Sequence, residues 1–458
     1  MTESRYRSQS FWLDTTPDSL EPRPALTSDV EVDVAIVGAG FTGLWTAYYL
    51  KRLSPGLSVA IVEAEIAGFG ASGRNGGWCL GTLAGIGEIL ESDPVGAVRL
   101  QRELIETLGE VERVCVREGI DCHWARGGNI NVATSEPFRE QLLEGLAYWR
   151  RIGIEEDEVR WLEPDECSSM IRTATNLGGL YLEPVAALHP ARLVRGLATA
   201  VERLGVTIYE RSPAVKLERG AVVTAAGRVR AELVVRAAEG YTRTIRGHRR
   251  AIIPMHSMMI ATEPLPHSVW DEIGLANRET FGDPRRSVTY GQRTADGRFA
   301  FGCRGSYFFG SKIKNRFAPD DPVFGEVRDV LESFFPVLCD YQVTHRWGGA
   351  LGIPRTWTPS VGIDRKAGLG WAGGYVGEGV GPSNLAGHTL AELILERESQ
   401  RTDLPLVGKP FPTWEPEPLR AIGVAALDWF AEQLDAANLQ GRPTPRLRGA
   451  IYKAFVRK

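Results

Sequence analysis

Residues 31–43 read EVDVAIVGAGFTG, and this stretch sets the fold class. Its first seven residues form a short apolar run rich in valine, which predicts a buried β-strand. Apolar residues at helical spacing follow in residues 44–50 (LWTAYYL), and a second predicted strand, residues 58–62, ends at Glu63. A strand, a glycine-rich turn, a helix, a second strand and an acid in this order predict a dinucleotide-binding βαβ unit of the Rossmann type.

Each glycine of the turn has a separate physical task. Gly38 permits the tight turn, Gly40 lets a pyrophosphate approach the backbone, and Gly43 allows the helix to pack closely on the strand. The N-terminus of the helix attracts phosphate, and Glu63 accepts a hydrogen bond from a ribose hydroxyl. A structural βαβ unit without a ligand is the alternative. The predicted cofactor contacts of this unit are Gly38, Gly40, Phe41, Thr42, Gly43 and Glu63.

The composition of the whole chain is that of an ordinary globular protein. The 458 residues are 43% hydrophobic and 24% charged, and this length favours two or three lobes. A net charge of −4 argues against a nucleic-acid partner. No apolar run is long enough for a signal peptide or a transmembrane helix, and the six cysteines show no metal-ligand spacing. We therefore expect a cytoplasmic protein with reduced thiols and no metal site.

Two further glycine-rich segments accompany the first. Residues 68–77 read GFGASGRNGG, and residues 373–381 read GGYVGEGVG and lead into a predicted helix. Together the three segments resemble the D-amino-acid oxidase-like family of FAD-dependent oxidoreductases, and the GASGRNGG part is most similar to the gamma-glutamylputrescine oxidase branch. The resemblance runs over residues 30–397 of this sequence and implies FAD as the cofactor.

The resemblance also implies which residues contact FAD. The segment 68–77 passes along the pyrophosphate and beneath the isoalloxazine ring, where glycine suits a close approach of backbone to a flat ligand; a mobile surface loop is the alternative. The late segment feeds a helix whose N–H groups stabilise negative charge on the reduced ring. Arg236 and Glu239 depart from the small or neutral residues usual in the family. The implied contacts are Gly70, Ala71, Ser72, Arg74, Asn75, Gly76, Gly77, Val215 at the adenine, Ala238, Gly240, Gly374, Gly377, Glu378, Gly379 and Val380.

The predicted fold class is α/β, with a Rossmann-like FAD-binding domain of the glutathione-reductase type that is discontinuous in sequence. An α+β substrate lobe, built on an antiparallel sheet, fills the inserts. An amphipathic pattern predicts a helix within residues 416–436, and the basic tail, residues 446–458, packs on its own domain or serves as a membrane-surface or partner helix. The expected parts are residues 29–85, 180–250 and 345–400 for the FAD domain, 86–179 and 251–344 for the substrate lobe, and 401–458 for a C-terminal helical extension.

The substrate lobe offers three candidate pocket residues. Alternation of apolar and polar residues at 255–262 and 287–304 predicts an antiparallel sheet, which the resemblance places over one face of the flavin. Tyr290 and Arg304 are the candidates for the pocket wall, and His256 is a third. An arginine there suits a carboxylate or a phosphonate through paired hydrogen bonds. The alternative places Arg304 on a solvent-facing side of the sheet and His256 in a packed or surface position.

The expected reaction follows from the flavin. In the leading hypothesis the C–N bond of a small amine or amino acid is oxidised to an imine, water releases a carbonyl, and molecular oxygen reoxidises the flavin to give hydrogen peroxide. Cys79 is the one candidate for a covalent tether near the glycine segment, and we expect non-covalent FAD. One alternative is a dehydrogenase that passes electrons to a quinone or carrier protein. Another is a flavin-binding subunit of a complex. The sequence carries no signal for the oligomeric state.

Overall fold

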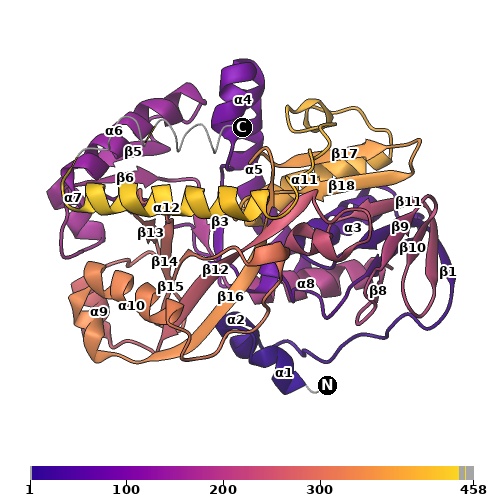
Figure 1. Ribbon diagram of the computed structural model, residues 1–458, viewed down its shortest axis with the longest axis horizontal. Coiled ribbons are helices and arrows are strands. Elements are labelled where there is room, and N and C mark those ends of the chain that lie inside the picture. Colours follow the sequence, from indigo (N-terminus) through magenta and orange to yellow (C-terminus); the bar gives the residue numbers. More distant parts are fainter. Residues whose placement is uncertain (1–2, 443–448, 450–458) are drawn as a thin grey trace.

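The computed structural model describes residues 3–442 and residue 449. In this part of the chain two eight-stranded sheets lie side by side (Figure 1). A two-stranded sheet, formed by β3 (Trp78–Leu80) and β7 (Val185–Ala187), lies near the middle of the molecule. This two-lobed α/β architecture confirms the predicted fold class.

The first sheet is the dinucleotide-binding one. Its order is β17-β18-β11-β1-β2-β8, and the hairpin β9–β10 is attached to β11. β1 pairs in parallel with both β2 and β11, and β2 pairs in parallel with β8. The second half of β1 and all of β2 are buried, as expected for parallel strands covered on both faces. The strands are β1 (Val30–Val37), β2 (Val59–Val62), β8 (Thr207–Tyr209), β9 (Lys216–Glu218), β10 (Ala221–Val223), β11 (Arg228–Arg236), β17 (Ser360–Asp364) and β18 (Leu369–Gly373).

Four helices build the main core with this sheet. α3 (Phe41–Leu53) is buried along most of its length and packs on α11 (Val380–Ile394). α5 (Pro94–Glu118) and α8 (Pro190–Arg203) pack on the same group and are amphipathic. A helix that is apolar all round belongs in an interior, so α3 and α11 form the centre of this lobe.

The second sheet has the order β16-β12-β15-β14-β13-β4-β6-β5. It is antiparallel except for the parallel pair β13–β4, so the predicted antiparallel sheet is in fact mixed. Its strands are β4 (Asn129–Val132), β5 (Val159–Leu162), β6 (Gly179–Leu182), β12 (Ile252–Thr262), β13 (Thr280–Gly282), β14 (Thr289–Arg293), β15 (Phe299–Arg304) and β16 (Val343–Pro354), and the helices around it are α6 (Glu136–Arg151), α7 (Pro164–Met170), α9 (His267–Ile273) and α10 (Val323–Phe334).

Three elements fall on the other side of the predicted domain boundaries. β6 and β16 were expected in the FAD domain but belong to the second sheet, because they pair with β4, β5 and β12. α5 was expected in the substrate lobe but packs in the core of the first sheet. In each case the element belongs to the domain with which it pairs or packs. The local sequence does not show which element that partner is.

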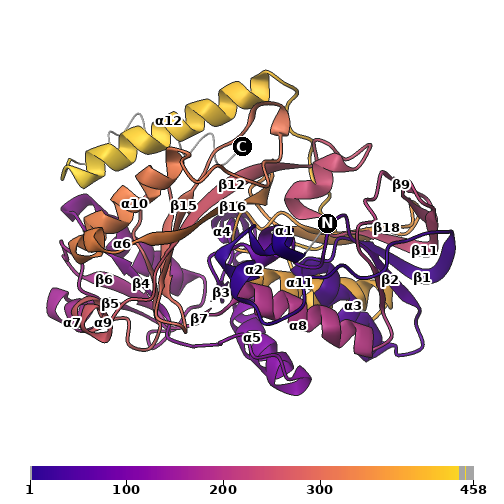
Figure 2. The same ribbon diagram turned by 90° about the horizontal axis from the view of Figure 1, so that it is seen from below.

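The N-terminal segment lies between the two lobes (Figure 2), where α1 (Glu3–Arg7) packs on α2 (Phe11–Thr15) and α2 contacts α8 and β16. Its aromatic side chains are fully buried, among them Tyr6, Phe11 and Trp12. The N-terminal sequence, residues 1–28, is polar overall and contains three prolines, so the burial of these aromatic side chains is a finding of the structure.

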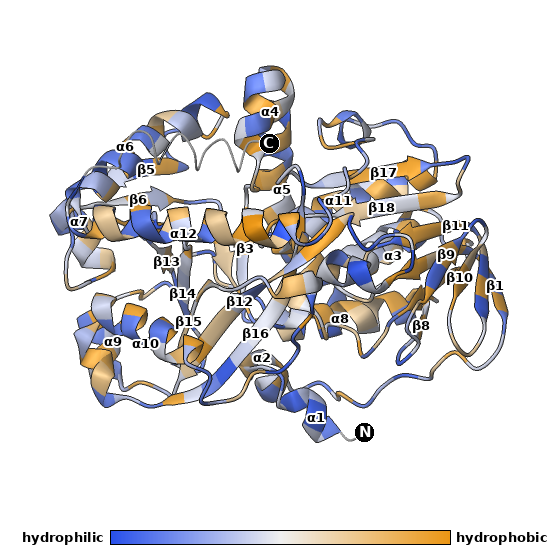
Figure 3. Cartoon of the chain, in the orientation of Figure 1, coloured by the Kyte–Doolittle hydropathy of each residue, from blue (hydrophilic) through white to orange (hydrophobic). Residues whose placement is uncertain are grey.

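The predicted C-terminal helix is present as α12 (Leu419–Leu439), which crosses the second lobe as the long yellow helix of Figure 1. Apolar and hydrophilic residues are mixed along it (Figure 3), and one side packs inward through Val424, Leu427 and Leu434. Asp435 of α12 accepts hydrogen bonds from the N–H groups of Arg286 and Ser287, both at 2.9 Å. Most of the basic tail lies outside the described residues. In the described part of the chain no helix is long and apolar enough to cross a membrane.

Two 3₁₀ helices and one short helix complete the parts near the site. η1 (Ala71–Gly73) lies within the second glycine segment, and η2 (Glu239–Thr244) follows β11. α4 (Ile86–Ser92) follows β3 and packs on α5.

Candidate functional site

The turn between β1 and α3 has the form of a phosphate cradle. Gly38 has φ 109°, and a Cβ there would lie 2.6 Å from the Ala237 carbonyl oxygen. A Cβ on Gly43 would lie 2.0 Å from the Gly38 oxygen, so helix and strand pack too closely for any side chain. The first N–H groups of a helix have no carbonyl one turn earlier. Of these, Phe41 N–H donates to Ser72 Oγ at 2.9 Å, which joins the first glycine turn to the second glycine segment.

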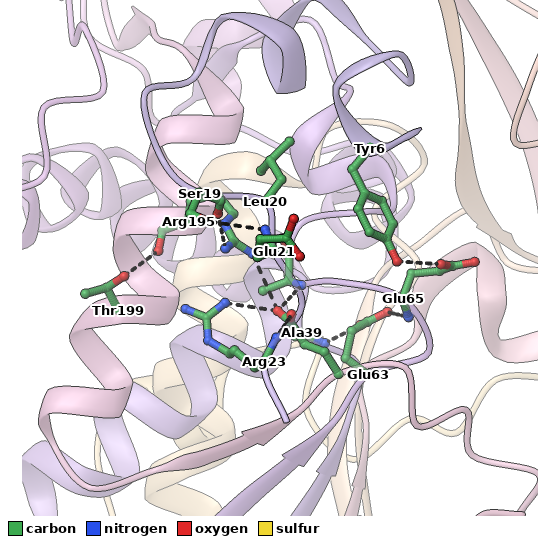
Figure 4. Close-up of polar contacts among 12 residues, drawn as sticks. Tyr6, Ser19, Leu20, Glu21, Arg23, Ala39, Glu63, Glu65, Arg195 and Thr199 are labelled. Atoms are coloured by element: carbon green, nitrogen blue, oxygen red, sulfur yellow. Dashed lines mark hydrogen bonds and ion pairs between the residues drawn. The ribbon is translucent and has the colours of Figure 1, made fainter. Parts of the chain in front are cut away.

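Glu63 stands at the end of β2 beside this turn (Figure 4). Its Oε2 accepts from Ala39 N–H at 2.8 Å and its Oε1 from Glu65 N–H at 3.0 Å. Burial raises the pKa of Glu63 to about 7, although the backbone N–H groups act in the opposite direction. The two backbone bonds therefore fix the carboxylate in place. Its remaining lone pairs can accept hydrogen bonds from the hydroxyls of a ribose.

We expect cofactor affinity to depend on pH through Glu63. A ribose hydroxyl donates to the ionised carboxylate, so binding favours loss of the proton that Glu63 holds below about pH 7. The dissociation constant for FAD should fall as pH rises toward 7, by at most about tenfold per pH unit, and level off above it. Titration of the apoprotein with FAD from pH 5.5 to 8.5 measures this, and Glu63→Gln should flatten the curve. An equal slope in the variant would show that another group is responsible.

The second glycine segment is held from within by Asn75. Its Nδ2 donates to the carbonyl oxygens of Ala71 and Ser72, both at 3.1 Å, and its Oδ1 accepts from Gly77 N–H at 2.8 Å. Asn75 thus shapes the loop through side-chain to backbone bonds, as short polar residues do in turns. The segment is ordered and packed, which rejects the alternative of a mobile surface loop.

Arg74 does not offer its charge to a ligand. It is 2% exposed, and its guanidinium donates to the oxygens of Phe69 (2.7 Å), Asn315 (2.8 Å) and Gly348 (3.3 Å) and to Gln9 Oε1 (3.3 Å). Burial lowers its pKa. The expectation of a cofactor contact is therefore corrected: Arg74 fastens the segment to the second lobe and to the N-terminal segment.

Gly76 and Gly77 have no room for a side chain, because residues of β14 lie directly against them. A Cβ on Gly76 would lie 2.7 Å from the Tyr290 ring, and one on Gly77 would lie 2.2 Å from Gln292 Nε2. Gln292 Nε2 also donates to the oxygens of Gly76 (2.6 Å) and Gly77 (3.1 Å). Sequence reasoning missed Gln292, because nothing local marks a glutamine that pairs with a loop more than 200 residues away.

The late glycine segment leads into α11, as predicted. Thr42 Oγ1 and the Tyr375 hydroxyl are 3.0 Å apart and tie α3 to this segment. Gly377, Gly379 and Val380 lie at the start of α11, whose unpaired N–H groups and positive dipole end suit the electron-rich edge of a ring. Glu378 is partly buried, its carboxylate accepts from Ala84 N–H, and burial raises its pKa to about 7.

Glu239 is one of the two departures from the family pattern, and its carboxylate binds the late glycine segment. This contact changes the role expected for Gly374. The Glu239 carboxylate accepts from Gly374 N–H at 2.6 Å and from Tyr375 N–H at 3.3 Å, and burial raises its pKa to about 7. Gly374 N–H is thereby used inside the protein. Arg236, the other departure, is buried and lies 2.8 Å from His248 Nδ1.

The backbone groups or close neighbours of three further expected contacts are engaged within the protein. Val215 is 48% exposed, its N–H donates to Val223 and its carbonyl accepts from Arg246, so only the second lone pair of that carbonyl is free for a further bond. A Cβ on Gly240 would lie 3.2 Å from the Leu351 oxygen, which explains that glycine by its closeness to β16. Ala238 accepts from Tyr241 N–H within η2.

Register shows which face of the second sheet meets the glycine segments. Ser257 pairs with Arg304, Met259 with Gly302, and Tyr290 with Gly302, so these positions share one face. The Tyr290 and Ser257 hydroxyls are hydrogen-bonded, and the Tyr290 ring lies over Gly76. Burial raises the pKa of Tyr290 well above its usual value, so the phenol stays neutral. Position 304 lies on β15 and is paired with Ser257 of β12, whereas the side chain of Arg304 lies outside the described part of the structure.

His256 lies on the opposite side of β12 from Ser257, and its expected pocket role is corrected. It is fully buried, its Nδ1 lies 3.3 Å from the Ser306 oxygen, and its Nε2 accepts from Lys314 N–H at 3.0 Å. Burial lowers the pKa of His256 to about 4. Both ring nitrogens hold the loop 306–314, so this histidine is a neutral structural residue, as the packed alternative supposed.

The indole N–H of Trp78 is a buried donor at the site that has no acceptor among the described residues. Trp78 packs edge-on to Tyr290, with ring centroids 6.0 Å apart. Buried polar groups are normally paired, so this indole N–H beside the glycine segment is available to a ligand. Within the described residues no group of His, Cys, Asp or Glu could hold a metal ion.

The fold and the three glycine segments define a Rossmann-type flavoprotein, and comparison with known proteins specifies the class. The family model "FAD dependent oxidoreductase" (DAO) matches residues 33–393, and the chain belongs to this family. This confirms the resemblance seen in the sequence and makes FAD the cofactor. The cradle at α3, Glu63 and the start of α11 fit FAD as the family requires.

Two relatives show where in the family the chain lies. It is 29% identical over 401 residues to "Probable oxidoreductase OrdL" of Haemophilus influenzae, covering 84% of this chain and 88% of that protein. It is 28% identical over 402 residues to "Gamma-glutamylputrescine oxidoreductase" of Escherichia coli, covering 86% and 90%. The glycine oxidase structure from Geobacillus kaustophilus has a TM-score of 0.66 at 22% identity, covering 81% of this chain and 96% of that one, and shows the shared fold.

Proposed function

We propose that this protein oxidises the C–N bond of a small amine or amino acid to an imine, which water then converts to a carbonyl. Bound non-covalent FAD supplies a two-electron acceptor, and molecular oxygen is the final acceptor, giving hydrogen peroxide. The names of two similar proteins, a gamma-glutamylputrescine oxidoreductase and a glycine oxidase, support an amine donor.

The observation that carries this proposal is the hydroxyl pair of Tyr290 and Ser257 above Gly76. Both groups are neutral, and the pair faces the segment that holds the cofactor. An alkyl amine must lose its proton before a hydride leaves the adjacent carbon, because an ammonium has no lone pair to stabilise the product imine. A neutral phenol can accept from or donate to such an amine without holding it as a cation.

A hydroxyl deletion tests the role of Tyr290. Tyr290→Phe keeps the ring over Gly76 and removes only the hydroxyl, so kcat/KM should fall about tenfold, the loss expected for one hydrogen bond to substrate, while FAD content is unchanged. Tyr181→Phe is the matched control, because the Tyr181 hydroxyl donates to the Gly127 oxygen at 3.1 Å and belongs to β6, which pairs with β4 and β5 in the second sheet. Equal activity of both variants would remove Tyr290 from the substrate site.

Anaerobic bleaching of the flavin by a panel of amines and amino acids tests the reaction itself. An amine donor predicts rapid bleaching, a kcat/KM that rises with pH toward the amine pKa near 10, and peroxide formation in air. Rapid dye reduction with negligible oxygen uptake would assign a dehydrogenase instead. A protein loaded with FAD that no amine bleaches would be a flavin-binding subunit.

Two finer points belong to the same proposal. We include in the proposal that Arg304, at the register position paired with Ser257, binds an acidic group of the substrate. Arg304→Met should then raise KM for amines that carry a carboxylate and leave KM for neutral amines unchanged. Cys79 is fully buried and burial raises its pKa, which supports non-covalent FAD. Acid precipitation should release all of the chromophore into the supernatant.

A further inference from the structure

The N-terminal segment makes direct polar contacts with the backbone of the second glycine segment. Ser10 begins α2 as its N-cap, and its hydroxyl accepts from Leu13 N–H and donates to the Gly73 oxygen, both at 3.1 Å. Trp12 Nε1 donates to the Asn75 oxygen at 2.8 Å. Ser10 is 4% exposed and Trp12 is 1% exposed, so these bonds are made away from water.

These contacts complete a row of donors along residues 73–77. Besides Ser10 and Trp12, Trp347 Nε1 donates to the Arg74 oxygen at 2.9 Å, and Gln292 serves the oxygens of Gly76 and Gly77. Every carbonyl of this stretch therefore has a side-chain donor. Because all four donor residues are buried, the peptide planes cannot turn without leaving a buried carbonyl unpaired.

The fixed carbonyl of Asn75 sets the direction of the next N–H. In a trans peptide the C=O and the following N–H point in opposite directions. Trp12 holds the Asn75 oxygen, so Gly76 N–H points away from the N-terminal segment. Gly77 N–H is used by Asn75 Oδ1, whereas Gly76 N–H has no acceptor among the described residues. Gly76 N–H is thus a free and oriented donor beneath Tyr290.

Aromatic packing holds the N-terminal segment in place where it contacts the second glycine segment. The rings of Phe11 and Trp12 are 4.8 Å apart, those of Trp12 and Trp347 are 6.4 Å apart, and Tyr6 packs edge-on to Phe69 at 6.1 Å. Arg5 and Tyr6 also bond the Glu65 carboxylate, next to Glu63 (Figure 4 shows Tyr6 and Glu65). The segment touches the cofactor side at two places, yet it precedes residue 33, where the family match begins.

We propose that residues 5–13 are a working part of the cofactor site, and that Ser10 and Trp12 are positioning residues which aim Gly76 N–H at the bound flavin ring. The inference rests on the assignment of FAD to this site. A donor held toward the ring stabilises negative charge that develops on reduction, so it affects both the affinity for FAD and the ease of its reduction.

Trp12→Phe tests this with little change of packing, because it removes the indole N–H and keeps an aromatic ring. We expect the dissociation constant for FAD, measured by titrating the apoprotein, to rise about tenfold, which is 1.4 kcal/mol. The midpoint potential of the bound flavin should become more negative. Ser10→Ala, a smaller change, should move both quantities in the same direction.

Trp270→Phe is the matched control. Trp270 is 3% exposed and its Nε1 donates to the Gly297 oxygen at 3.0 Å, so the bond lost is of the same kind, but it lies in α9 of the second lobe. This control should lower the unfolding temperature and leave FAD affinity and potential unchanged. For Trp12→Phe, flavin release on heating should precede loss of the circular dichroism signal.

Two outcomes would overturn the inference. The first is a Trp12→Phe protein whose FAD affinity and potential equal those of the wild type while its unfolding temperature falls as in the control, which would make the contact purely structural. The second is a Ser10→Ala protein that folds and shows neither change, which decides the question if Trp12→Phe does not fold. A wild-type protein that binds no FAD would refute the cofactor assignment instead.

Discussion

Gly43→Ala should give a protein that is purified without FAD. The added Cβ would lie 2.0 Å from the Gly38 oxygen and 3.2 Å from Ile36 Cγ2, and both belong to the strand and turn that face α3. Backbone atoms cannot move aside as a side chain can, so α3 must shift outward and carry its first N–H groups away from the pyrophosphate. Overpacking costs about 3 kcal/mol, which is roughly a hundredfold in affinity. The ratio of flavin to protein absorbance measures the effect.

Gly56→Ala is the control for this change. Gly56 lies in the loop between α3 and β2, and a Cβ there meets nothing within 4 Å. This variant should bind FAD like the wild type. A Gly43→Ala protein that retains stoichiometric FAD and the wild-type unfolding temperature would contradict the close helix–strand packing on which the dinucleotide assignment depends.

Arg74→Met should destabilise the protein more than any other single side-chain change discussed above. The methionine is apolar and fills part of the space, but it leaves three carbonyls and the Gln9 amide oxygen without their donor. Each unpaired buried acceptor costs about 1–3 kcal/mol, and partial relaxation limits the total to about 4 kcal/mol. Denaturant unfolding followed by circular dichroism measures the change, and FAD affinity should fall with it because the segment 69–77 loses its anchor.

Arg113→Met provides the comparison. Arg113 lies on α5 with 58% of its side chain exposed and pairs with Glu110 one turn away. Surface pairs of this kind contribute little, so this variant should stay within about 0.5 kcal/mol of the wild type. If both substitutions had the same small effect, Arg74 would not be the link between the lobes that its contacts describe.

The cofactor unit was predictable because its determinants are local. Strand β1, the turn at Gly38–Gly43, helix α3 and Glu63 follow one another within 34 residues, and each requirement falls on a neighbouring position. The glycines there are set by a positive φ and by contacts inside the same unit, so spacing alone reveals them. The second and third glycine segments were recognisable only through resemblance to a family.

The substrate face was predicted in part, for a reason that lies in strand geometry. Alternation identifies which positions share a face: it grouped positions 302 and 304, and the strand register adds position 290 to the same face. Alternation does not say which face meets the cofactor, because that depends on how the sheet is placed against another lobe. His256 was therefore taken for a pocket residue, although it points to the side held by Ser306 and Lys314.

Sequence alone was sufficient for the glycine turn at residues 38–43, for Glu63 and for the two-lobed α/β class, since these depend on backbone conformation and on contacts between near neighbours. Tertiary structure alone revealed that Arg74 is an internal fastener, that Gly76 and Gly77 are small to admit Tyr290 and Gln292, and that Ser10 and Trp12 hold the same loop. Those roles depend on contacts between residues 63 to 274 positions apart in the sequence, and such contacts exist only in the folded chain.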